Sequence, residues 1–187
     1  MVQEGYLGGQ VATNIIDYIT ISTTGNATDY GDLTVARFAL TACSNSTRGI
    51  FGGGYSTALE NTIDYITIST TGNATDFGDL TTARYSLASC SSSTRGIFGG
   101  GTTGTVSNII EYIIISTAGN STDFGDLTIN RTGLAACSNS TRGIFGGGYS
   151  TALENTIDYI TIATTGNAVD FGDLTVARRF LGACSGN

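Results

Sequence analysis

The chain repeats itself every 47 residues, and this period constrains its fold more than any other feature. The segment DYITI at 17–21 returns at 64–68 and 158–162, and as EYIII at 111–115. An arginine and a cysteine return at the same spacing, at Arg37, Arg84, Arg131 and Arg178 and at Cys43, Cys90, Cys137 and Cys184. Four periods account for nearly all of the 187 residues. The sequence therefore predicts one domain, residues 1–187, made of four copies of a single unit.

Each unit contains four short segments typical of β-strands. In one copy they lie at 38–43, 49–53, 61–69 and around 76–80, and they are separated by turns rich in Gly, Asn, Ser and Thr. The segments are rich in β-branched and aromatic residues, and none shows a helical period. With 27 glycines and no proline, the chain is expected to be all-β with tight glycine turns.

The order of signals within the unit resembles the kelch repeat. A Gly-Gly doublet ends one strand, a tyrosine lies in the next, an aromatic residue precedes a leucine, and an arginine opens the following unit. Where kelch blades usually carry tryptophan, this chain has Tyr30, Phe77, Phe124 and Phe171. The resemblance implies a four-bladed kelch-like β-propeller. The segments RGIFGGG and TGNATDFGDLT are also similar to repeats of structural proteins of tailed phages, particularly marine phages and cyanophages.

A single blade cannot bury both of its faces, so the blades are expected to stack around an axis. The chain ends with a first strand at 180–184 and starts with a second strand at 5–9. Pairing of these two segments would complete the N-terminal blade and close a four-bladed ring. Two alternatives are an eight-bladed ring formed by two chains that exchange end strands, and a β-solenoid.

The composition argues against enzymatic activity. Without histidine or lysine, the chain cannot form a Ser-His-Asp triad, a histidine metal site or a Schiff base. The remaining carboxylates, tyrosines, cysteines and arginines recur in every unit, whereas catalysis normally needs an asymmetric group of residues. We expect no enzyme and no cofactor; an enzyme that uses carboxylates in a central channel is the most remote reading.

The net charge of −7 argues against two classes of partner. An acidic chain repels nucleic-acid phosphates and anionic membrane surfaces. No apolar run approaches the ~20 residues of a membrane helix, and residues 1–7 do not resemble a secretion signal. We expect neither nucleic-acid binding nor membrane insertion.

Two repeated features could in principle bind metal, although a structural role is the simpler interpretation of each. Four thiols on an axis-lining strand could form a ring for zinc or iron, but small apolar side chains among alanines explain them better. The loop at 72–79 offers Asn73, Asp76 and Asp79 as calcium ligands, but these residues also stabilise turns. Arg84 is expected to pair with an acidic side chain of its own blade or the next.

The loop between the second and third strands varies most among the copies. It reads YSTALE at 55–60 and 149–154, TTGTVS at 102–107, and only QVAT at 10–13. Variable loops on a rigid scaffold are common places for partner contacts. The ligand-binding candidates are Tyr55, Glu60, Tyr149 and Glu154, because a tyrosine can stack on a sugar whose hydroxyls a carboxylate binds.

These features predict a non-enzymatic binding or structural module. The leading hypothesis is a virion component, in a tail fibre or surface decoration, that contributes to host-surface attachment. Its partners would be other virion proteins or a cell-surface glycan, and it could form homo-oligomers. The alternative is a soluble lectin-like propeller, extracellular or cytoplasmic, with one sugar site per blade.

Overall fold

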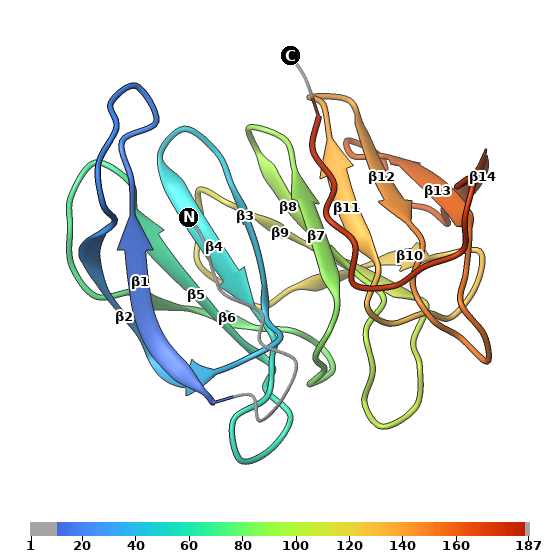
Figure 1. Cartoon of the computed structure of the whole chain (residues 1–187), viewed down its shortest axis with the longest axis horizontal. Coiled ribbons are helices and arrows are strands. Elements are labelled where there is room, and N and C mark those ends of the chain that lie inside the picture. Colours follow the sequence, from blue (N-terminus) through green and yellow to red (C-terminus); the bar gives the residue numbers. More distant parts are fainter. Residues whose placement is uncertain (1–10, 186–187) are drawn as a thin grey trace.

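A computed structural model describes residues 11–185, which form antiparallel β-sheets joined in a row (Figure 1). The first sheet contains β1 (Thr13–Tyr18) and β2 (Thr28–Arg37). Each of the other three contains four strands that pair in chain order. The described residues contain no helix, and hence none able to span a membrane.

The three larger sheets have matching strand lengths and registers, as expected for copies of one unit. The second sheet consists of β3 (Thr41–Ser44), β4 (Arg48–Gly52), β5 (Thr62–Thr67) and β6 (Thr75–Asp79). The third consists of β7 (Ala88–Ser91), β8 (Arg95–Gly99), β9 (Ile109–Ile114) and β10 (Thr122–Asp126). The fourth consists of β11 (Ala135–Ser138), β12 (Arg142–Gly146), β13 (Thr156–Thr161) and β14 (Val169–Asp173). The all-β class and the four-strand unit predicted from the sequence are confirmed.

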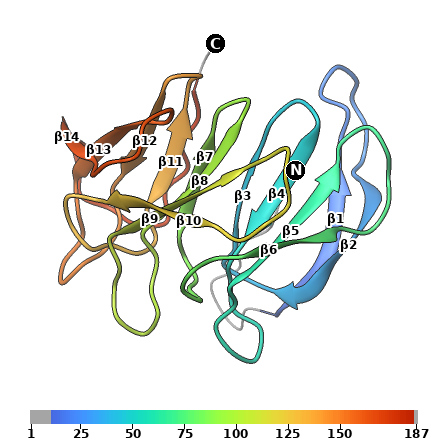
Figure 2. The same ribbon diagram turned by 180° about the vertical axis from the view of Figure 1, so that it is seen from behind.

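The sheets lie face to face in chain order. In both views the sheet β1–β2 lies at one end of the row and the sheet β11–β14 at the other (Figures 1 and 2). The described residues therefore do not show the expected closed ring. Of the two segments expected to close it, 5–9 lies outside the described residues. Residues 180–184 form no strand with β1 or β2. They lie instead alongside β11 and the residues just before it.

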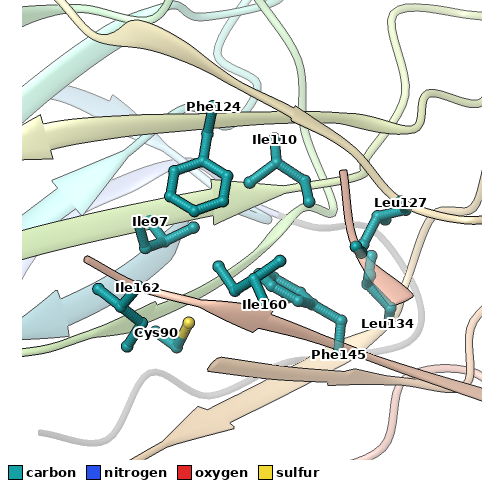
Figure 3. Packing of buried hydrophobic residues seen from close by; sticks show 11 residues of the cluster. Cys90, Ile97, Ile110, Phe124, Leu127, Leu134, Phe145, Ile160 and Ile162 are labelled. Atoms are coloured by element: carbon teal, nitrogen blue, oxygen red, sulfur yellow. The ribbon is translucent and has the colours of Figure 1, made fainter. Parts of the chain in front are cut away.

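Apolar side chains fill the space between neighbouring sheets. Between the third and fourth sheets, Phe124, Ile110 and Ile97 face Ile160 and Phe145, and all five are buried (Figure 3). Alternate residues of a strand point to opposite faces, so an inner sheet contributes to two such layers. This two-sided burial explains why the strands are rich in isoleucine on both faces.

Each sheet has a β-bulge in its last two strands, and in the first three sheets the bulge places one aromatic ring in the apolar layer between that sheet and the next. In the second sheet Ile63 pairs with Gly78 and Asp64 with Asp76, so Phe77 is the extra residue between them. Its side chain is only 2% exposed. Gly78 has a φ of +142°, and a Cβ there would lie 2.5 Å from the backbone carbon of Gly119 in the next sheet. The bulge and the contact between sheets both require glycine at this position.

The role of this close approach can be tested with a matched pair of glycines. Gly172 has nearly the same φ, +138°, but no atom lies within 4 Å of a Cβ built there. We expect Gly78→Ala to lower the free energy of unfolding by about 1–3 kcal/mol more than Gly172→Ala, because only the first substitution overpacks an interface. Urea denaturation of dilute protein measures both, and equal losses would contradict the close packing of the sheets.

Candidate functional sites

Three ion pairs are buried between successive sheets. They join a guanidinium nitrogen to a carboxylate oxygen at 2.9, 2.8 and 2.7 Å, in the pairs Arg37–Asp64, Arg84–Glu111 and Arg131–Asp158. All six side chains have no exposed surface. Each arginine ends one sheet or follows it, and each carboxylate lies on the third strand of the next sheet. The expectation that Arg84 pairs with an acidic residue is confirmed, and its partner belongs to the following sheet.

Further hydrogen bonds complete each carboxylate site. The backbone N–H of Thr81 donates to Oε1 of Glu111 at 3.0 Å, and Nη1 of Arg84 donates to the carbonyl of Ile109 at 2.9 Å. Burial lowers the pKa of Arg84 and raises the pKa of Glu111, while the attraction between the two charges opposes both shifts. The Nε atom of Arg84 finds no acceptor among residues 11–185. These charges are strongly desolvated, so each depends on its partner.

Removing the arginine of a buried pair should lower the free energy of unfolding far more than removing the exposed arginine at the equivalent repeat position. Arg84→Ala would leave Glu111 as an unpaired buried charge, and we expect a loss of about 3–5 kcal/mol in the free energy of unfolding. Arg178 occupies the equivalent repeat position but is exposed. Arg178→Ala should therefore change the stability by less than about 0.5 kcal/mol. Guanidinium denaturation followed by circular dichroism compares the two, and similar losses would refute the buried-pair account.

The four cysteines lie on successive sheets and differ in exposure. Cys90 is buried, and its Sγ lies only 2.6 Å from the position of a Cβ on Gly143 in the next sheet. Cys184 is exposed. Burial raises the pKa of Cys43 to about 12 and also raises the pKa of Cys90. The inner thiols thus serve as small packing groups in the layers between sheets, and all four are free.

Thiol reactivity should follow this order of exposure. At pH 8 we expect iodoacetamide to modify Cys184 first and Cys90 last, because the thiolate is the reactive species and burial suppresses it. Peptide mass spectrometry at successive times identifies the modified cysteine. Cys184→Ser should abolish the fast phase, whereas rapid modification of Cys90 in the folded protein would contradict its packing.

The loop considered as a calcium site uses its asparagine to join neighbouring sheets. Oδ1 of Asn73 accepts a hydrogen bond from the backbone N–H of Asp32 at 3.1 Å. Asn120 binds Asp79 in the same way at 3.0 Å. Among residues 11–185, no group of three or more potential metal-ligating side chains lies close together. The asparagine therefore positions one sheet on the next, a role that the sequence did not indicate.

The loops between the second and third strands lie along one edge of the row. They follow β4, β8 and β12 and extend below the sheets in Figure 1, and the first and third contain the ligand-binding candidates. Tyr55 and Tyr149 lie in the first and third of these loops and are half-buried. The ring of Tyr55 lies against Phe38 and Tyr85, with centroid distances of 5.5 and 5.9 Å. The ring of Tyr149 packs under the guanidinium of Arg179, at 5.1 Å. Tyr55 thus takes part in aromatic packing, and Tyr149 in a cation–π contact.

The two candidate glutamates hold their loops together. The carboxylate of Glu60 accepts hydrogen bonds from the hydroxyls of Ser56 and Thr62. The backbone N–H of Glu154 donates to the carbonyl of Gly148 at the start of its loop, at 2.9 Å. Each glutamate shares its loop with a candidate tyrosine, but Tyr55 and Tyr149 lie two sheets apart. The exposed part of these loops is at their tips, residues 57–58 and 151–153.

A shallow hollow on the third sheet is too small to hold a drug-sized ligand. It lies between β9 and the turn that follows, is lined by residues that include Tyr112, Asn120 and Thr122, and measures about 170 Å³. Small-molecule sites usually occupy about 300–1,000 Å³.

No protein-family model matches the sequence, and none of the curated proteins gives a match. The resemblances to the kelch repeat and to phage repeats therefore stay predictions.

Proposed function

We propose that the chain is a non-enzymatic structural and binding module, and that it serves in a virion as part of a tail fibre or surface decoration that contributes to host attachment. The observation that carries this proposal is the use of the buried charges. Three arginines and three carboxylates bind one another between sheets in the same way each time. Such identical pairs favour a scaffold, because catalytic groups require surroundings that differ from one another.

The scaffold also supports a repeated display of loops. Each inner sheet is fixed to its neighbours by an ion pair, an asparagine bond and an apolar layer. The loops after β4, β8 and β12 are thereby held side by side on one edge (Figure 1). Several weak contacts on a rigid support bind a repetitive surface more tightly than one contact does. A bacterial surface polysaccharide is a repetitive ligand of this kind.

The proposed place in a virion rests on the similarity of the repeat sequence to repeats of tailed-phage structural proteins. Its partners would be other virion proteins and a cell-surface glycan. A soluble lectin-like module is the alternative function. It predicts that the isolated chain binds glycans at several weak sites, whereas a virion part acts within a larger assembly.

The attachment surface can be tested by placing charge on the exposed loop tips. We expect beads coated with the wild-type chain to bind some members of a panel of immobilised bacterial lipopolysaccharides and capsular polysaccharides. The double variant Thr57→Glu/Thr151→Glu should bind at least about tenfold more weakly, because a lost contact of 1.4 kcal/mol has this effect. Thr47→Glu/Thr141→Glu is the matched control, since these exposed residues lie in turns at the opposite edge.

Two outcomes would contradict the proposal. Coated beads that bind no member of the panel would argue against attachment through a glycan. Equal weakening in the loop and control variants would show that the loop edge is not the binding surface.

A further inference from the structure

Within residues 11–185, the row of sheets ends in two exposed faces of the kind that pack together inside it. On the last sheet Phe171 is 56% exposed, whereas its equivalent Phe77 is 2% exposed. At the end of β1 in the first sheet, Ile19 is 46% exposed, whereas its equivalent Ile66 is 4% exposed. At each inner interface, the face of one sheet that carries the equivalent of Phe77 packs on the face of the next sheet that carries the equivalent of Ile66. The two ends therefore carry the two halves of one more interface.

The two end faces also carry the two charges of one more ion pair. Arg178 is exposed on the last sheet and occupies the repeat position of the three buried arginines. Asp17 is exposed on β1 and occupies the position of the three buried carboxylates. We propose that the last sheet of one chain packs on the first sheet of a second copy, where Arg178 pairs with Asp17 of that copy.

The backbone contacts of the inner interfaces have unused counterparts at the ends. Inside the row, a Gly-Asn pair of one sheet binds the backbone of the sheet before it. The N–H of Gly119 donates to the carbonyl of Phe77 at 2.7 Å, and the N–H of Asp79 donates to Oδ1 of Asn120 at 3.0 Å. The equivalent residues at the ends are Gly25 with Phe171 and Asn26 with Asp173. No atom among residues 11–185 lies within 4 Å of a Cβ built on Gly172, whereas a Cβ built on its equivalent Gly78 would lie 2.5 Å from the backbone of the next sheet.

The last described segment is also placed to serve a further sheet. Phe180 donates its N–H to the carbonyl of Gly133 at 2.7 Å, and the hydroxyl of Ser185 donates to the carbonyl of Ser138 at 2.7 Å. The hydroxyl of Ser138 makes the same bond to Ser91, one sheet earlier, at 2.7 Å. Residues 180–185 thus lie where the first strand of a fifth sheet would lie. Among the described residues the first sheet contains only β1 and β2, and residues 180–185 of a second copy would take the place of its first strand.

The occupant is a second copy rather than the same chain because the two faces lie at opposite ends of the row (Figures 1 and 2). A contact between unlike faces repeats from chain to chain, and it produces a ring or a filament according to the rotation at each step. This inference does not depend on what the loops bind.

A mixing experiment with two charge reversals tests the contact. The wild type should show a mass above 19.2 kDa that increases with concentration in sedimentation velocity. Arg178→Asp alone puts two aspartates in contact and Asp17→Arg alone puts two arginines in contact, so each variant should remain at the monomer mass. In an equimolar mixture every contact between unlike chains joins opposite charges, and association should return.

The control is Asp123→Arg, a reversal at an exposed position of an inner sheet, which should associate like the wild type. Circular dichroism verifies that each variant is folded. The proposal is overturned if the wild type stays at the monomer mass throughout the concentration series. It is also overturned if either single reversal associates normally, or if the mixture does not recover. A monomer that each reversal destabilises and the double reversal restores would instead identify a ring closed within one chain.

Discussion

The buried arginine–carboxylate pair is the constraint on which the arrangement of the sheets depends. A guanidinium with no exposed surface needs an anionic partner, since an unpaired buried charge costs several kcal/mol. Arg84 follows the last strand of one sheet and Glu111 lies on the third strand of the next, so the pair joins the two sheets. The hydrogen bond from Thr81 to the same carboxylate then fixes the register between the two sheets.

The apolar layers supply the attraction that the ion pairs cannot. Burial acts against the charge of both Arg84 and Glu111, and such pairs commonly add little net stability compared with apolar residues of the same volume. The burial of Phe77 and Ile66 favours stacking of the sheets, but apolar contact alone permits sliding. The pairs define one position, and the glycine at the bulge allows the backbones to approach closely enough for the pairs to form.

The repeat, the strands and the class of the fold could be predicted from the sequence because each depends on local pattern. The sequence indicates that Arg84 pairs with an acidic residue. It does not indicate which sheet supplies that residue, because this depends on how neighbouring sheets are offset. Closure depends on the small rotation between sheets, which the same residues permit in a row or a ring. The roles of Asn73 and Glu60 were missed because their hydrogen-bond partners are set by tertiary packing and by the shape of the loop.

The equal spacing of the interface residues has a consequence for the gene. Every interface joins groups supplied by adjacent units, as the bonds between Ser138 and Ser91 and between Ser185 and Ser138 show. An unequal recombination that adds or deletes one whole unit keeps every remaining interface intact, because the new neighbours present the same residues to each other. Coding length can therefore change in steps of one unit without a compensating mutation, while the loop that reads TTGTVS in one unit and YSTALE in another is free to diverge.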